Sequence, residues 1–241
     1  MSCYTVHRRL RRNLPVIAGI GVFWLSLLHA GWMKWGNILI DSWRDPYVVW
    51  RMVEDGVNLY TDVVYEFGFL PPCVLAAVAR VFGCGPQVFI GVGTMISLAV
   101  TVLVYRISRF FIPRVWSAGV VVSFLTVCVF RALEAYDLGS YILPYSFAAT
   151  FFVLWICLSL YAMLRWIFKS DTRFLWMAGI ALALAGWSRP LMTLPVFLAM
   201  ATVWLISSGK SFRLPVRLGA VLVPPVLCAA GWVIYFSLYG G

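Results

Sequence analysis

Long apolar runs separated by short polar segments dominate the chain. The four longest uncharged runs each reach the roughly 20 residues that an α-helix needs to cross the hydrocarbon of a bilayer. They are Leu14–Met33, Pro86–Tyr105, Leu138–Leu164 and Leu218–Leu238, and shorter runs cover Val115–Phe130, Phe174–Ser188 and Pro190–Ser208. Polar and apolar residues do not alternate at period two, as they would in strands with one wet face. The pattern predicts an all-α membrane protein.

Composition and charge agree with this class. Hydrophobic residues make up 63% of the chain and charged residues 12%, too few to cover the surface of a water-soluble fold of 241 residues. The net charge of +10 comes from basic residues at the ends of apolar runs, which is typical of topology signals rather than of a nucleic-acid site. Trp32, at the end of the first run, and Lys34 and Trp35, directly after it, stand where a small-residue cleavage site would be, so we expect that run to remain as a signal anchor.

The number of crossings depends on the short apolar stretch Phe69–Phe82, which ends at the breaker Gly83–Pro86. If this stretch stays on the outer face, 13 of the 19 Lys and Arg residues lie in cytoplasmic segments; if it crosses, only 7 do. The preference of Lys and Arg for the cytoplasmic side selects the first arrangement. The sequence therefore predicts seven crossings of the plasma (inner) membrane, a cytoplasmic N-terminus and an interfacial helix at Phe69–Phe82.

This topology makes residues 1–241 a single transmembrane bundle with two loops on the outer face. The first outer loop covers residues 34–85 and the second covers residues 131–144. We expect a helix from about Ser42 to Asp55 in the first loop, and a tight helical hairpin over Phe174–Ser208 that turns at Arg189 and Pro190.

Acidic residues gather in the first outer loop. Six of the nine acids lie there: Asp41, Asp45, Glu54, Asp55, Asp62 and Glu66. We expect Asp45, Glu54 and Asp55 on the wet face of the loop helix. Asp41 follows the apolar triplet 38–40, so we expect it near the edge of the apolar layer of the membrane. A carboxylate in surroundings of low dielectric is costly and often functional. The structural alternative for Asp41 is an N-cap of the following helix.

Three segments of this loop carry a resemblance to a known family. They are Asp41-Ser42-Trp43-Arg44, Glu54-Asp55-Gly56-Val57-Asn58-Leu59-Tyr60-Thr61-Asp62 and Tyr65-Glu66-Phe67-Gly68-Phe69-Leu70-Pro71-Pro72. Together they resemble the first outer loop of the GT-C glycosyltransferases, which include protein O-mannosyltransferases and the lipid A aminoarabinose transferase. Two later segments, Leu143–Ser146 and Gly179–Pro190, are also similar, so the resemblance extends over Leu14 to Ile206. Phe69 stands where the family usually has Pro.

The resemblance implies inverting transfer of a sugar on the outer face, from a polyprenyl-phosphate donor to a lipid, glycan or protein acceptor. Asp41 aligns with the family's acidic residue, which takes the proton of the attacking acceptor. The departing lipid phosphate needs positive charge, for which Arg44 and Arg189 are the candidates. A divalent cation, Mg or Mn, could serve the same purpose. The alternative for Arg189 is a side chain that extends to the outer interface from a helix end.

Four further residues are candidates for supporting roles. Glu134 and Asp137, in the second outer loop, could assist Asp41 or bind a metal, or could only solvate the loop. Asp62 matches the family pattern but could act only by stabilising the loop. Tyr60 could shape a lipid or sugar site, although tyrosines also collect at membrane interfaces without such a role.

Two other classes of function remain open. A transporter of small solutes or lipids would usually show repeated halves and ionisable groups at mid-membrane, and neither is visible. A non-catalytic or truncated subunit is the other alternative, because the C-terminal half of the usual family architecture is absent. A partner chain would then supply the missing part.

Overall fold

The computed structural model describes residues 3–31, 43–130, 142, 144, 146–169, 171–207 and 214–239. Within these ranges the chain forms nine α-helices and a short π-helical segment, η2, and it contains no strand beyond an isolated bridge between Leu59 and Val63. The predicted all-α class is confirmed.

The helices overlap the apolar runs, although α1 begins eleven residues before the run that starts at Leu14 and α6 begins nine residues after the start of its run at Leu138. They are α1 (Cys3–Gly31), α2 (Arg44–Glu54), α3 (Leu70–Phe82), α4 (Pro86–Ser108), α5 (Arg114–Phe124) continued by η2 (Leu125–Val129), α6 (Phe147–Lys169), α7 (Thr172–Ser188), α8 (Pro190–Ser207) and α9 (Leu214–Tyr239). The expected loop helix is α2, and the expected short helix after it is α3.

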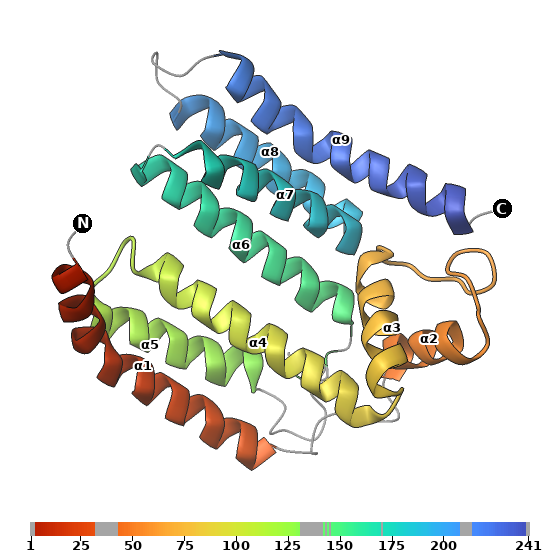
Figure 1. Cartoon of the computed structure of the whole chain (residues 1–241), viewed down its shortest axis with the longest axis horizontal. Helices are drawn as coiled ribbons and strands as arrows, with labels where there is room; N and C mark the ends of the chain where they lie inside the picture. Colours follow the sequence, from red (N-terminus) through yellow and green to blue (C-terminus); the bar gives the residue numbers. More distant parts are fainter. Residues whose placement is uncertain are drawn as a thin grey trace.

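The long helices lie side by side in a slab, with α6 near its middle (Figure 1). α6 packs against α4 on one side and against α7 on the other, while α7 also contacts α8 and α9. α1 packs against α5. Two buried clusters result: one joins α1–α6 around Val49, Phe89 and Phe147, and the other joins α6, α7 and α8 around Trp166, Leu182 and Met200.

Helices α2 and α3 lie together at one end of this slab, and α3 runs across the long helices rather than along them (Figure 1). α3 begins with two prolines in its first turn, a position where the missing N–H groups cost nothing, and it stops at Gly83, whose φ of 88° suits only glycine. Its 13 residues extend about 20 Å, against the ~30 Å of bilayer hydrocarbon. We call this part of the molecule the α2–α3 end.

The predicted hairpin between α7 and α8 is confirmed. α7 begins where the Asp171 carboxylate accepts a hydrogen bond from the Arg173 backbone N–H at 3.0 Å. It ends at Arg189, whose extended backbone (φ −145°, ψ 87°) precedes Pro190, the first residue of α8. A residue before proline disfavours the helical conformation, which explains why one helix stops and the next starts within a single residue.

Two of the helices, α4 and α6, are long and apolar enough to cross a membrane by length and composition, as far as the described residues show. Only 39% of the most apolar window of each is buried inside the protein. Large hydrophobic side chains also stand exposed on other helices, among them Trp116 (71%), Leu191 (88%) and Val233 (66%). These features agree with the membrane class predicted from the sequence, whereas seven crossings and their orientation stay predictions.

Candidate functional site

Two arginines that are far apart in the sequence meet at one aromatic ring at the α2–α3 end. The guanidinium carbon of Arg44 lies 4.8 Å from the centre of the Phe67 ring, and that of Arg189 lies 4.6 Å from the same centre. The two distances together limit the separation of the guanidinium carbons to about 9 Å. The structure therefore brings together the two residues predicted from the sequence to bind a phosphate.

The first loop reaches Arg189 because it docks on the end of α7. The Gly68 N–H donates a hydrogen bond to the Ser188 carbonyl at 3.0 Å. A β-carbon added to Gly68 would stand 1.9 Å from the carbonyl oxygen of Trp187, so only glycine lets the two backbones approach this closely. This contact sets Phe67 against Arg189, the residue after Ser188.

Asp45 lies at the centre of this end, and its expected position on the wet face of the loop helix was wrong. Its side chain is 1% exposed. One carboxylate oxygen accepts a hydrogen bond from the Tyr65 hydroxyl at 3.1 Å, and the other accepts one from the Phe147 backbone N–H at 2.6 Å. Phe147 is the first residue of α6, where backbone N–H groups have no partner within the helix. Asp45 thus ties α2, the loop and the start of α6 together.

The sequence did contain a signal for this burial. Val48, Val49 and Met52 follow Asp45 at spacings of three, four and seven residues, so all four share one face of α2. Val48 and Val49 are buried in two different apolar clusters. Charge alone suggested a solvated Asp45, whereas its place in the apolar stripe indicated burial.

One arginine, Arg44, lies close to Asp45, and the charge of a second, Arg189, also acts on its carboxyl group. Burial raises the pKa of its carboxyl group, while the Phe147 N–H, the guanidinium of Arg44, the Tyr65 hydroxyl and the charge of Arg189 all act in the opposite direction. The Nε atom of Arg44 lies 3.8 Å from Asp45, and an Nη atom of Arg44 lies 4.0 Å from Glu66. Burial likewise raises the pKa of the Tyr65 hydroxyl, with the charge of Asp45 adding to the effect.

Arg189 differs from Arg44 in its acidic partners. Among the described residues no carboxylate lies within ion-pair distance of Arg189, and its Nε atom is buried without a hydrogen-bond partner. A buried donor without an acceptor is costly, and the cost falls if a ligand supplies the acceptor. An anion beside Phe67 would meet this need, because phosphate oxygens pair with the fork of guanidinium donors.

Tyr60 and Asp62 hold the loop in shape. Asp62 accepts a hydrogen bond from the Asn58 N–H at 2.9 Å, and the Tyr60 hydroxyl donates to the Phe67 carbonyl. Tyr60 has a φ of 72°, a left-handed conformation that few side chains adopt. Its ring packs against α9, 5.7 Å from the centre of Trp232. The loop-stabilising role considered for Asp62 is therefore present, and direct substrate roles for both residues stay predictions.

The remaining predicted site residues, Asp41, Glu134 and Asp137, lie outside the described residues. Within the described part of the chain, no group of three or more His, Cys, Asp or Glu side chains converges to hold a metal ion. The Mg or Mn implied by the resemblance stays a prediction.

A scan against models of protein families, a search of curated proteins and a search of solved structures each found no match to this chain. The resemblance to GT-C glycosyltransferases therefore depends on the sequence segments quoted above.

Proposed function

We propose that this protein is a multi-pass membrane glycosyltransferase of the GT-C type, which transfers a sugar from a polyprenyl-phosphate donor at the outer face of the membrane. The observation that carries the proposal is the placement of Arg44 and Arg189 at one ring, Phe67. A guanidinium that pairs with a phosphate holds its carbon about 4 Å from phosphorus, so one phosphate can contact two guanidiniums about 8 Å apart. The limit of about 9 Å leaves room for this arrangement.

The exposed apolar surface supports the membrane setting of the proposal. Water-soluble monomers rarely expose large contiguous apolar patches, whereas a bilayer favours them. Seven crossings by α1, α4, α5 with η2, α6, α7, α8 and α9 would leave α2 and α3 at the outer interface, which fits the short length of α3. The α2–α3 end then faces the side where a lipid-linked sugar presents its phosphate.

The proposed chemistry uses the residues next to this pair. Asp41, three positions before Arg44 in the sequence, accepts the proton of the acceptor hydroxyl or amine. The freed lone pair forms a bond to the anomeric carbon from the face opposite the phosphate, so the configuration inverts. The bond between the anomeric carbon and the phosphate oxygen breaks, and its electron pair stays on the lipid phosphate. Arg44 and Arg189 stabilise that growing negative charge.

The proposal is tested by transfer of radiolabelled sugar from polyprenyl-phosphate donors, using the full chain reconstituted in lipid. We expect donor-dependent transfer by the wild type and at least a hundredfold loss in Asp41→Asn, since a positioned general base contributes about that much or more. Asp55→Asn is the matched control, because Asp55 lies in the same loop, is exposed and pairs only locally with Arg51.

Two outcomes would contradict the proposal in different ways. Full activity of Asp41→Asn would remove Asp41 from the mechanism while leaving the enzyme. Absence of transfer from every polyprenyl-phosphate sugar tried, by wild-type protein that retains its helical content, would refute the enzyme itself. Uptake of a labelled solute by the same vesicles without any sugar lipid would instead favour a transporter.

A further inference from the structure

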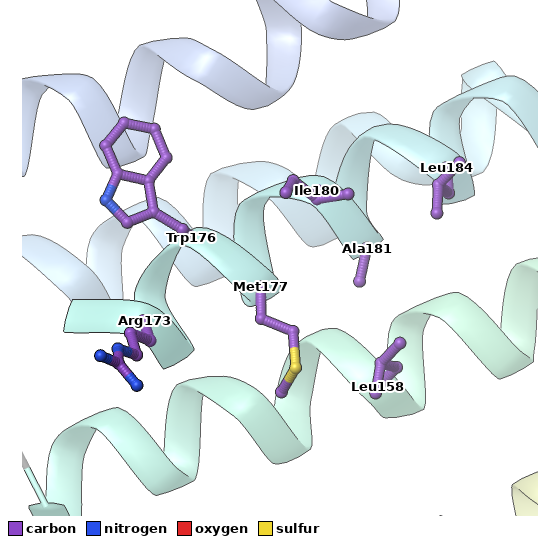
Figure 2. A pocket seen from close by; sticks show the side chains of 7 residues that line it. All are labelled: Leu158, Arg173, Trp176, Met177, Ile180, Ala181 and Leu184. Carbon is purple, nitrogen blue, oxygen red and sulfur yellow. The ribbon is translucent and has the colours of Figure 1, made fainter. Parts of the chain in front are cut away.

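A groove between α6 and α7 begins at the end of α7 opposite Arg189 and extends along that helix to Leu184. It has a volume of about 400 Å³ and is lined by Leu158 of α6 and by Arg173, Trp176, Met177, Ile180, Ala181 and Leu184 of α7. Figure 2 shows Met177 and Ala181 facing Leu158 across the groove, with Arg173 at the start of α7. Six of these seven lining residues are uncharged, so the groove is apolar along its length, and the side chain of Arg173 stands at one end of it.

Further basic residues lie close to Arg173 in the sequence, at the turn between α6 and α7. Arg165 and Lys169 lie in the last turns of α6, and Arg173 lies in the first turn of α7. Asp171 is the one acid in this stretch, and its carboxylate already accepts the Arg173 backbone N–H. The Arg165 guanidinium lies over the Phe174 ring at 5.2 Å, which fixes it beside the turn. Three positive charges against one negative charge make this turn attractive to an anion.

The length of the groove matches one leaflet of a bilayer. From Arg173 to Leu184 the helix rises about 17 Å, close to the ~15 Å of one half of the bilayer hydrocarbon. α6, which forms the other wall, is one of the two helices long and apolar enough to cross a membrane. Arg165 and Lys169 near its end would then lie at the level of the lipid phosphates.

We propose that this groove binds one acyl chain of an anionic phospholipid, with the lipid phosphate beside Arg173. Basic pockets between transmembrane helices recognise anionic headgroups through charge, while an apolar groove takes the chain. The excess of positive charge at the turn favours an anionic lipid over a zwitterionic one. The headgroup end of the site, at Arg173, lies at the opposite end of α7 from Arg189, so the proposal requires membrane embedding but not the proposed sugar transfer.

The charged part of the site is tested by lipid retention. The full chain is purified from vesicles that contain equal amounts of dioleoyl phosphatidylglycerol and dioleoyl phosphatidylcholine, and the retained lipids are measured by native mass spectrometry. We expect preferential retention of phosphatidylglycerol and about a fivefold reduction in Arg173→Gln, the effect of one basic residue near a lipid surface. Arg80→Gln, an exposed arginine of α3, is the matched control and should retain the wild-type amount.

Equal retention of the two lipids by the wild type, or an equal loss in both variants, would overturn the proposal. The apolar part is tested on the wild type alone, with phosphatidylglycerol that carries a photoactivatable diazirine in its acyl chain. We expect the cross-links to concentrate on residues 173–184. Equal labelling of the exposed apolar face of α8 at Leu191, Leu194 and Leu198 would indicate general contact with bilayer lipid and would overturn the site.

Discussion

The two ends of α7 each carry an arginine in a different setting. Arg173, in the first turn, is exposed beside an apolar groove and basic neighbours from the same hairpin. Arg189, directly after the last turn, lies against Phe67, and its charge opposes part of the rise that burial causes in the pKa of Asp45. The neighbours of Arg173 are close in sequence, whereas those of Arg189 come from a loop more than 100 positions earlier.

This contrast shows how the same residue type acquires different chemistry. The Arg173 end needs only the α6–α7 hairpin, whose helices are joined by local contacts such as the 2.7 Å hydrogen bond from the Ser159 hydroxyl to the Ala178 carbonyl. The Arg189 end needs the first loop to dock, which depends on Gly68 and Asp45. A substitution that prevents the first loop from docking on α7 should therefore change the surroundings of Arg189 and leave those of Arg173 unchanged.

The largest effect is expected for Gly68→Ala. Its added methyl group would meet the Trp187 carbonyl oxygen, a backbone atom that cannot turn away, so the loop must lift from α7. We expect a loss of about 3 kcal/mol in the free energy of unfolding, measured by denaturant titration in mixed micelles, and loss of sugar transfer. Phosphatidylglycerol retention at the Arg173 end should be unchanged.

Gly119→Ala provides the control for this substitution. Gly119 lies in α5, and a β-carbon there would meet nothing within 4 Å. Alanine should be neutral or stabilising there, because it has the higher helix propensity. If both variants lose stability equally, the docking contact at Gly68 does not explain the loss.

The next largest effect is expected for Asp45→Asn. The amide keeps one acceptor but replaces the other with an N–H₂ group, which would face either the Tyr65 hydroxyl or the Phe147 N–H. We expect a loss of about 2 kcal/mol in unfolding free energy, since a buried donor is left unsatisfied. Asp55→Asn, on the exposed end of the same helix, should change it little. If the two substitutions lowered the unfolding free energy equally, the buried hydrogen bonds of Asp45 would not contribute to stability.

Substitution of the two arginines tests the comparison directly. Arg189→Gln should raise the KM for the polyprenyl-phosphate donor about tenfold, equal to about 1.4 kcal/mol, because one charge-assisted contact to phosphate is lost. Arg189→Lys should recover only part of this, since an ammonium lacks the planar fork of donors. Arg173→Gln should leave the KM at its wild-type value. The reverse result would assign the donor phosphate to the other end of α7.

The smallest effect is a pH dependence of stability at the Arg189 end. Burial raises the folded-state pKa of Asp45, so the carboxyl group binds its proton more tightly in the folded protein than in the unfolded one. Its contribution is fully present below the unfolded pKa and is lost as the pH rises through the folded pKa. The difference in unfolding free energy between wild type and Asp45→Asn should therefore shrink with rising pH. A difference that grows with pH would indicate a lowered pKa.

Much of the fold could be predicted because apolar runs, prolines and glycines close to each helix indicate where it lies in the sequence. The apolar runs predicted the long helices. Pro71 and Gly83 indicated the two ends of α3, and Arg189 with Pro190 indicated the turn between α7 and α8. The uncharged run begins at Leu138, but α6 begins at Phe147, three residues after the predicted end of the second outer loop at residue 144. Uncharged residues alone do not reveal that start, which depends on the Asp45 carboxylate that accepts the Phe147 N–H.

The candidate site divides in the same way. Arg44 could be chosen because it lies in a segment that resembles the family, and Arg189 because a charge between two apolar helices is costly. Asp62 could be interpreted as a loop residue from the family pattern. Asp45 and Phe67 were not among the candidates, although Phe67 lies in one of the segments that resemble the family. Their importance comes from a buried network and a shared ring, and both join segments distant in the sequence.

The sequence by itself determined the all-helical class, most helix boundaries and the choice of Arg44 and Arg189 as candidate residues. The signals for these, such as apolar runs, helix-breaking residues and isolated charges, each extend over only a few residues. Only the tertiary structure decided that Arg44 and Arg189 share Phe67, that Asp45 is buried, and that Gly68 lies against the Trp187 carbonyl. These facts depend on the approach of one loop to one helix end. Such an approach is selected by the packing of the whole bundle, because many weak contacts from distant segments must be satisfied at once.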